Sequence, residues 1–380
     1  MKSIYIDEDL AAIRQAVAEF VEKEIVPNVD QWERTGEVPR SLLEQMGSLG
    51  FFGLRVSEEH GGVGLGHIAS VVFAGELGRS TSGGTAITVL VHTDLAMPYL
   101  TRFGSEEQKA RWLPGMMTGE LISAIGVTEP DAGSDVAAIR TTARRDGEGW
   151  RLNGTKMFIT NGGIADLVFI AARTDPDAKA SRGMTIFAVE KGTEGFTATR
   201  ALEKMGWHAS NTAELVLDDV WVPDSNVIGE VNQGFYYVMA NFQNERIALM
   251  AAAIGECQEA IDRTVAYVKE RRAFGAPLWE KQAIRQRLAM RQAEVDAARQ
   301  LVYHTAWLLD QGEDAVREVS ECKALVGELS NRVLYDCVQF HGGMGYMRET
   351  PVERMYRDVR INSIGGGATE VMLDEIAKRL

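Results

Sequence analysis

The sequence predicts an α+β fold in which two helical blocks flank a central antiparallel β domain. Three observations support this. Apolar residues recur with a helical period before Leu121, short segments rich in Val, Ile, Phe and Trp follow, and the helical period returns from Gly234 onward. A chain of 380 residues also exceeds the size at which one hydrophobic core stops growing. We therefore predict an N-terminal helical domain at 1–120, a β domain at 121–230 and a C-terminal helical domain at 231–380.

The first block begins with an amphipathic helix over Asp9–Ile25, in which Leu10, Ile13, Val17 and Phe20 recur at spacings of three and four. Gly-rich turns separate the helices that follow it. Those further helices are expected at Arg40–Leu49, Ile68–Leu77, Ala86–Phe103 and Ser105–Met117.

The middle block consists of short β-prone segments that Gly, Asn and Asp interrupt. Strands are expected at Gly149–Leu152, Lys156–Thr160, Leu167–Ala171, Met184–Val189 and Glu214–Val222. The last block returns to long apolar stripes of helical period. Its helices are expected at Phe235–Arg271, Trp279–Gln311, Asp314–His341 and Val352–Asn362.

Composition excludes several classes of protein. The formal charge of −14 opposes binding to nucleic acid, which needs a basic surface. The cysteines, Cys257, Cys322 and Cys337, are too few and too widely spaced for a disulfide framework or a zinc site. The segment Met1–Glu8 carries acidic residues, and no apolar run reaches the length of a membrane span. We expect a cytoplasmic protein without a bound metal, a nucleic-acid partner or a membrane partner.

One glycine-rich segment, Gly61–Gly66, resembles the dinucleotide fingerprint of a Rossmann fold. That fingerprint needs a preceding buried strand, whereas the residues Ser57–His60 are polar. We therefore expect a loop here.

The β block contains two segments suited to a ligand. In Gly126–Asp135, a turn presents the hydroxyls of Thr128 and Ser134. Some twenty residues later, a predicted strand sets Phe158 near the hydroxyl of Thr160. Ordinary turns and a core strand use the same residue types, so these segments alone do not decide the function.

The C-terminal block contains two more. Glu270–Leu278 closes a long helix with two arginines, which either complement the helix dipole or bind a diphosphate. The last segment comprises Gln339–Tyr346 and Arg360–Glu370, and it includes Gly365–Gly367. Three consecutive glycines exceed what a helix cap requires and allow the backbone to approach a ligand closely.

The four segments, in this order and spacing, resemble the acyl-CoA dehydrogenase family over essentially the whole chain. The resemblance implies a fold with a helical N-terminal domain, a central β domain and a C-terminal four-helix bundle. It also implies tightly bound FAD, an acyl-CoA substrate, an electron-transfer flavoprotein as electron acceptor, and a homo-oligomer, most commonly a homotetramer.

The resemblance assigns cofactor roles by position. Thr128, Phe158 and Thr160 resemble the residues that hold and flank the isoalloxazine ring. A second group reaches a flavin in a neighbouring subunit and holds its pyrophosphate and adenosine. The full set implied for FAD is Ile125, Val127, Thr128, Gly133, Ser134, Phe158, Ile159, Thr160, Arg271, Phe274, Gln282, Gln339, Gly342, Gly343, Ala368 and Glu370. The set implied for the substrate is Ser134, Gln243, Arg246, Gly366 and Gly367, with Ser134 at the thioester end of the acyl pocket.

The catalytic base departs from the common family pattern. Many relatives carry it in a Tyr-Glu-Gly-Thr segment, and this chain has Gly366 at the place of that glutamate. In the isovaleryl-CoA and long-chain acyl-CoA enzymes the base lies on the long helix after the β domain, where this chain has Glu245. Periodicity supports Glu245, because Phe242 and Leu249 place it on an apolar stripe. Burial would raise its pKa towards neutrality.

The alternative for Glu245 is a partly solvated acid paired with a cation. Glu256 projects from nearly the same helix face, about 16 Å away along the helix, so the two cannot serve one site. The family position favours Glu245. The resemblance also makes the backbone N–H of Gly366 a donor to the thioester oxygen.

The predicted function is FAD-dependent dehydrogenation of an acyl-CoA thioester to the trans-2-enoyl-CoA, by α-proton abstraction and β-hydride transfer. The small residues Gly365 and Gly366 suggest branched or long acyl chains. The alternatives are an acyl-carrier-protein dehydrogenase or a flavin oxidase on the same fold. A non-catalytic or nucleic-acid-binding relative is a further class, which the acidic balance opposes.

Overall fold

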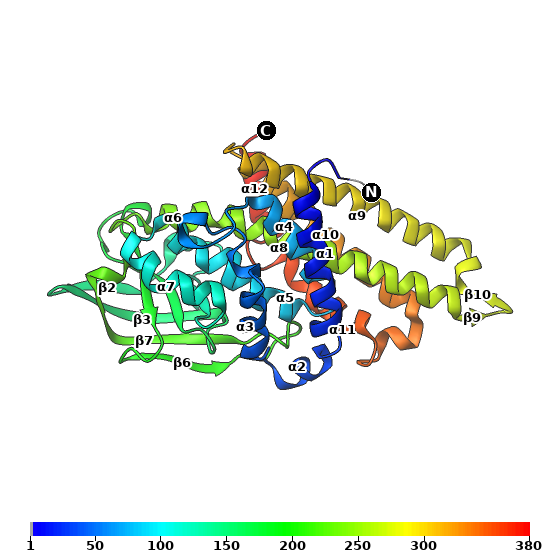
Figure 1. The fold of residues 1–380 in the computed structure, drawn as a ribbon, viewed down its shortest axis with the longest axis horizontal. Helices are drawn as coiled ribbons and strands as arrows, with labels where there is room; N and C mark the ends of the chain where they lie inside the picture. Colours follow the sequence, from blue (N-terminus) through cyan, green and yellow to red (C-terminus); the bar gives the residue numbers. More distant parts are fainter. Residues whose placement is uncertain (1–2) are drawn as a thin grey trace.

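The computed structural model describes residues 3–380, in the order helices, sheet and helices (Figure 1). The large sheet lies at one end of the molecule, and the hairpin between the first two long C-terminal helices lies at the other. The α, β, α order predicted from the sequence is confirmed.

The N-terminal block contains helices α1 (Glu8–Phe20), α2 (Val29–Thr35), α3 (Arg40–Ser48), α4 (His67–Gly78), α5 (Gly83–Leu90), α6 (Met97–Phe103) and α7 (Glu106–Thr118). Two predicted helices are interrupted by wide π-helical turns, Val21–Ile25 after α1 and Val91–Ala96 between α5 and α6. Such turns keep the helical direction while shifting the buried face, so periodicity alone did not reveal them. Gly61–Gly66 is a loop after a 3₁₀ turn, as predicted.

The sheet has the strand order β6-β7-β3-β2-β4-β5-β8, and β1 pairs with β4. Its strands are β1 (Ser123–Gly126), β2 (Thr142–Asp146), β3 (Gly149–Thr160), β4 (Leu167–Arg173), β5 (Met184–Glu190), β6 (Phe196–Ala201), β7 (Thr212–Pro223) and β8 (Val227–Ile228). Most pairs are antiparallel, whereas β1 and β2 each pair in parallel with β4. The β2–β3 hairpin supplies the long connection that a parallel pair requires.

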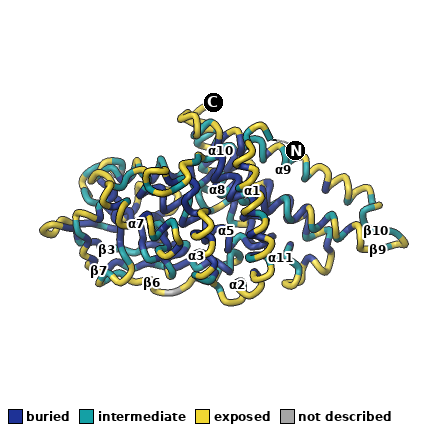
Figure 2. Tube along the Cα trace, viewed as in Figure 1, coloured by how far each residue is buried: buried dark blue, intermediate teal, exposed yellow. Residues whose placement is uncertain are grey.

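The C-terminal block is built on α8 (Gly234–Glu270), α9 (Gln282–Asp310) and α10 (Val316–His341). The short helices α11 (Pro351–Val359) and α12 (Thr369–Ala377) pack on α10, and a hairpin of β9 (Arg272–Ala273) and β10 (Ala276–Pro277) joins α8 to α9. Figure 2 shows α8 and α10 buried in the middle of the molecule and the β9–β10 hairpin exposed. No helix within residues 3–380 is long and apolar enough to cross a membrane.

Helices α4 and α8 touch backbone to backbone, which fixes α8 against the N-terminal block. A Cβ on Gly78 would lie 2.0 Å from the carbonyl oxygen of Ala252, and a Cβ on Gly255 would lie 1.9 Å from that of Gly75. Both distances are far below any real contact, so only glycine allows this approach. One hydrophobic core therefore runs through both helical blocks.

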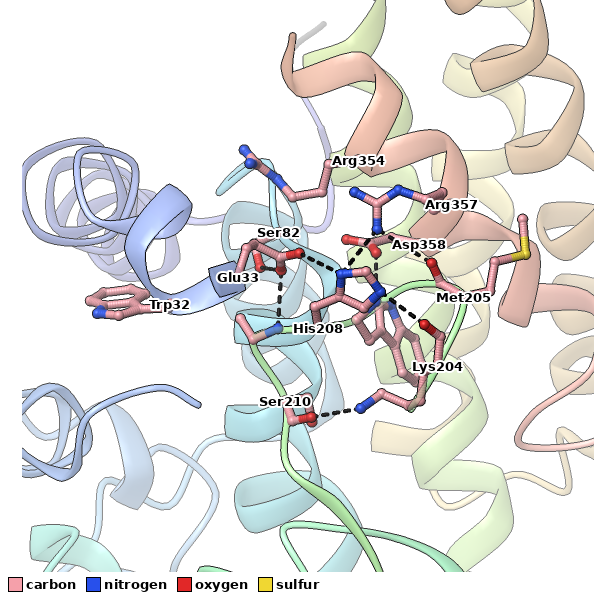
Figure 3. A network of polar contacts seen from close by, with 12 residues as sticks. Trp32, Glu33, Ser82, Lys204, Met205, His208, Ser210, Arg354, Arg357 and Asp358 are labelled. Atoms are coloured by element: carbon pink, nitrogen blue, oxygen red, sulfur yellow. Dashed lines mark hydrogen bonds and ion pairs between the residues drawn. The ribbon is translucent and has the colours of Figure 1, made fainter. Parts of the chain in front are cut away.

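A buried polar network joins the three parts of the chain (Figure 3). Glu33 of α2 accepts hydrogen bonds from the hydroxyl of Ser82 at 3.0 Å and from the backbone N–H of Ala209 at 3.1 Å. Asp358 of α11 accepts one from the backbone N–H of Trp207 at 2.6 Å. The β6–β7 loop is thus held between the first and last blocks.

Candidate active site

Glu245 lies on α8 and is half-buried on the face that meets the C-terminal loop. Burial raises the pKa of its carboxyl to about 7, against the opposing charges of Arg246 and Lys323. No hydrogen bond to its carboxylate occurs within the described chain. A carboxyl with this pKa takes up and releases a proton near neutral pH, as a general base must.

Gly366 lies directly against Glu245. Its φ is +67°, and a Cβ at this position would lie 3.2 Å from Oε1 of Glu245 and 3.0 Å from Cδ1 of Leu249. A side chain here would crowd the carboxylate, which would have to shift by a few tenths of an ångström. The carboxylate of Glu245 thus lies against the space that a side chain at position 366 would occupy.

Two cations hold the backbone beside Gly366. Arg246 is buried, and its Nε donates to the carbonyl oxygen of Gly366 at 3.1 Å. Lys323 of α10 is also buried, and its Nζ donates to the carbonyl oxygens of Asn362 at 2.6 Å and Gly367 at 2.9 Å. Sequence reasoning named Arg246 and missed Lys323.

Gln243 is the remaining substrate candidate on α8. Its Oε1 is buried and has no hydrogen-bond partner among the described residues. Buried polar atoms normally have a partner, so this acceptor is available to a donor on a bound molecule.

The candidate flavin segments meet at the end of β3. The backbone N–H of Met157 donates to the carbonyl oxygen of Thr128 at 2.9 Å. Lys156, which is fully buried, donates to the carbonyl oxygen of Val127 at 3.1 Å and to Oε1 of Glu129 at 2.7 Å. This buried ion pair ties the loop after β1 to β3, and sequence reasoning assigned it no role.

The flavin-edge candidates differ in exposure. Phe158 has a φ of +61° and leaves 67% of its surface exposed, so a large aromatic side chain there lacks a covering partner. Thr128 and Thr160 are half-buried, and Gly133 and Ser134 are exposed. Ile125 is half-buried, and the side chains of Val127 and Ile159 are buried in the hydrophobic core.

A small apolar cluster connects Glu245 to the flavin-edge strand. Ile87, Val91 and Leu95 of α5 and the turn after it form its centre, and Ile125 of β1 and Leu249 of α8 pack against it, as does Trp207. Leu249 lies one turn beyond Glu245. The cluster therefore connects the turn of α8 that follows Glu245 with the end of β1.

The candidates for the adenosine end of FAD form a separate group away from the sheet, and all of them are exposed. They are Arg271, Phe274, Gln282, Gln339, Gly342 and Gly343. Tyr267 stacks on His341 at 4.4 Å and donates to its carbonyl oxygen at 3.2 Å, which joins the end of α8 to the end of α10. Figure 1 places the neighbouring β9–β10 hairpin at the opposite end from the sheet, so one chain does not bring these residues to Phe158. Ala368 and Glu370 instead follow Gly366 at the start of α12.

Two cavities lie beside this region without including Glu245. One of about 290 Å³ is lined by Arg55 and Asp94 in the N-terminal block. The other, of about 840 Å³, lies between α1, α4, α8 and α9 and is lined by Ala251 and Ile254. The candidate base therefore does not line either cavity.

Comparisons with known proteins agree along the whole chain. Residues 7–120, 124–220 and 232–380 match the models of the N-terminal, middle and C-terminal domains of acyl-CoA dehydrogenase. Mouse mitochondrial long-chain specific acyl-CoA dehydrogenase is 39% identical over 97% of this chain and 85% of its own length. Mitochondrial isovaleryl-CoA dehydrogenase of Pongo abelii is 35% identical over 96% of this chain and 87% of its own length. A solved acyl-CoA dehydrogenase from Geobacillus kaustophilus is 41% identical, with a TM-score of 0.96 over 100% of this chain and 99% of that chain.

Proposed function

The chain belongs to the acyl-CoA dehydrogenase family and is an FAD-dependent acyl-CoA dehydrogenase, and we propose that Glu245 is the base that removes the α proton of its substrate. One observation carries this proposal: a desolvated carboxyl with a pKa of about 7 lies against Gly366, the place where many relatives have their glutamate. The reaction needs a base whose pKa is near the operating pH.

The segment around Gly366 suits the thioester end of the substrate. The carbonyl of Gly366 is occupied by Arg246, so its position is fixed, and we assign its N–H as a donor to the thioester oxygen. A donor fixed in advance stabilises developing negative charge without reorganisation, which makes the α proton easier to remove. FAD, when bound, accepts the hydride from the β carbon.

The residues at the end of β3 fit the flavin ring. Phe158 offers an uncovered aromatic surface, and Thr128 and Thr160 offer hydroxyls beside it. Gly133 is exposed, and a Cβ there would meet nothing within 4 Å. A solved relative with 27% identity is an FAD complex of PigA.

The exposed residues at the end of the molecule opposite the sheet support an oligomer, which we propose to be a homotetramer. Phe274 is 95% exposed at the tip of the β9–β10 hairpin, remote from the sheet of its own chain. If Arg271, Phe274, Gln282, Gln339, Gly342 and Gly343 hold the adenosine end of FAD, the ring of that FAD belongs to a neighbouring chain. A monomer that retains one FAD per chain would contradict this arrangement.

The substrate class rests on the small residues beside the base. Gly365 and Gly366 carry no side chains, and the nearby cluster of Ile87, Val91 and Leu95 is apolar. We therefore propose branched or long acyl chains, in keeping with the relatives named for long-chain and isovaleryl-CoA substrates.

We propose an electron-transfer flavoprotein as acceptor and a reducing cytoplasmic compartment. The acceptor is supported by a solved structure of 35% identity that concerns the electron transferring flavoprotein of Acidaminococcus fermentans. The compartment is supported by the three cysteines of this chain, which are free and buried.

One relative favours a second candidate function: the prolyl acyl carrier protein oxidase AnaB is 27% identical, with a TM-score of 0.94. Oxygen consumption and preference for a carrier-protein thioester would distinguish that oxidase from a dehydrogenase.

Anaerobic titration with a panel of acyl-CoA thioesters tests the proposed base. We expect the wild-type flavin absorbance to bleach and Glu245→Gln to stay yellow, with FAD bound, because the amide cannot accept the α proton. Asp262→Asn removes an exposed carboxylate from the same helix and should bleach like wild type. Full reduction of Glu245→Gln at the wild-type rate would refute the assignment.

A further inference from the structure

Lys323 is a buried cation to which the proposed reaction has so far given no role. It lies in the middle of α10 with 1% of its surface exposed. Within residues 3–380, no carboxylate oxygen lies within the 4.0 Å ion-pair distance of its nitrogen. An ammonium group is costly to bury without such a partner, so its presence calls for a physical reason.

Its hydrogen bonds provide the first part of that reason. Nζ donates to the carbonyl oxygens of Asn362 and Gly367, which begin and end the turn that carries Gly366. Arg246 donates to the carbonyl oxygen between them, that of Gly366. Two cations from different helices thus fix consecutive peptide groups of one short segment. Gly366 and Gly367, with φ of +67° and +112°, are the residues that can adopt this backbone.

The position of Lys323 relative to Glu245 provides the second part. A Cβ placed on Gly366 would lie 3.7 Å from Cε of Lys323 and 3.2 Å from Oε1 of Glu245. The side chains of Lys323 and Glu245 therefore approach the same glycine, with the methyl group of Leu249 as the third neighbour of this position. Low local polarity strengthens the attraction between the two charges.

The charged and titratable groups around this pair come from three helices. Arg246 of α8 and Lys323 of α10 lower the pKa of Glu245, and Glu245 in turn contributes to the raised pKa of Tyr99 on α6. Burial lowers the pKa of Lys323 to about 8, with Arg246 acting in the same direction and Glu245 and Glu328 opposing. Lys323 therefore titrates on the alkaline side of Glu245.

We propose that Lys323 is a positioning residue of the dehydrogenation: its buried ammonium fixes the Gly366–Gly367 backbone and keeps Glu245 in the carboxylate form that accepts the α proton. This inference rests on the proposed function, because it concerns the residue that supports the proposed base.

The decisive measurement is the pH dependence of flavin reduction by acyl-CoA in the FAD-loaded enzyme. Lys323→Met keeps the length of the side chain and removes its charge. We expect the apparent pKa of the base to rise by about one unit, so that reduction below that pKa slows about tenfold and recovers at higher pH. Lys323→Arg should restore most of the loss. Lys378→Met removes a positive charge at an exposed position on the chain's last turn and should leave the profile unchanged.

A second readout does not depend on turnover. Infrared difference titration without substrate follows the protonated carboxyl band of Glu245, identified by its loss in Glu245→Gln. The midpoint should shift upward in Lys323→Met. If this variant does not fold, Lys323→Gln keeps a donor for one carbonyl and allows the same measurement.

The outcomes separate the two proposals. Fast flavin reduction in Glu245→Gln would remove the proposed base and this inference with it. An inactive Glu245→Gln together with an unshifted midpoint and pH profile in a folded, FAD-loaded Lys323 variant would leave the base in place and overturn the role of Lys323. A purely structural lysine gives that second result, with lower stability but no shift.

Discussion

Gly366 combines a left-handed backbone with a crowded Cβ position, so replacing it tests the geometry of the base directly. In Gly366→Ala, the strained φ should cost about 1–2 kcal/mol of stability. The new methyl group would also push against Oε1 of Glu245, and a displaced base should slow flavin reduction by about tenfold or more. Thermal melting and stopped-flow reduction measure the two effects.

Gly312→Ala is the matched control. Gly312 has a φ of +75° and open space at its Cβ, so alanine there should cost similar stability and leave flavin reduction unchanged. Equal rates in wild type and Gly366→Ala would show that the carboxylate is not confined by this contact.

Glu245 was named as the candidate base from the sequence, whereas the buried Lys323 near it was not. The apolar stripe through Phe242 and Leu249 did not by itself separate Glu245 from Glu256; the position of the glutamate in the relatives that the chain resembles, together with the glycine at 366, favoured Glu245. Lys323 also lies on an apolar stripe, between Val319 and Val326, but a lysine in a long helix ordinarily reaches solvent. Its burial depends on the turn after α11 folding back over α10, which no local pattern encodes.

The loop after β1 depends on the ion pair between Lys156 and Glu129, so breaking that pair should loosen the flavin-edge site. In Lys156→Met, Glu129 remains buried with a charge and loses its cation, which should cost about 3–5 kcal/mol. Its remaining donors are the backbone N–H groups of Arg140 and Thr141. We expect a lower thermal midpoint and weaker FAD retention, measured by melting and by ultrafiltration of the yellow protein.

The double variant Lys156→Met with Glu129→Gln is the control for the unpaired charge. It removes the buried carboxylate and should recover part of the lost stability. If the single variant is as stable as wild type, the pair does not hold the loop.

Strand β3 shows why some elements were placed only approximately. The sequence predicted two strands, Gly149–Leu152 and Lys156–Thr160, because Asn and Gly interrupt the β-prone segment between them. In the structure one strand continues through a bulge, and a Cβ on Gly154 would lie 2.4 Å from Oγ1 of Thr141. Gly154 is required because a distant segment packs closely against the strand at this position, and it does not form a turn. A single sequence does not distinguish a glycine in a turn from a glycine at a close contact.

The arrangement of the three blocks was predicted in outline, and the contacts between them were not. Local periods give the order of helices and strands, but the backbone contact of α4 with α8 and the polar network of Figure 3 join residues far apart in the chain. The domain limits at 120 and 230 stay predictions. Glu33 and Asp358 are separated by most of the sequence, so their proximity had no sequence signal.

The network around Asp358 predicts how the stability of the assembled chain depends on pH. Burial, and then the charge of Glu33, raise the pKa of Asp358 to about 7 from its ordinary 3.8. Between these values the unfolded chain has lost this proton and the folded chain retains it. Stability contributed by this group therefore falls as pH rises through that window. Glu256, whose pKa is also raised, acts in the same direction.

Glu33→Gln should reduce this loss. The amide oxygen still accepts from Ser82 and Ala209, and an amide nitrogen replaces Oε2, which is buried without a hydrogen-bond partner among the described residues. With one negative charge removed, the pKa of Asp358 falls, and one unit corresponds to about 1.4 kcal/mol. We expect the variant and the wild type to have the same thermal midpoint near pH 5. Near pH 8 the variant should have the higher midpoint, which corresponds to a gain in the free energy of unfolding on the order of 1 kcal/mol. A variant that is less stable than wild type at both pH values would mean that Glu33 acts here as a hydrogen-bonding ion whose charge stabilises the three-block junction.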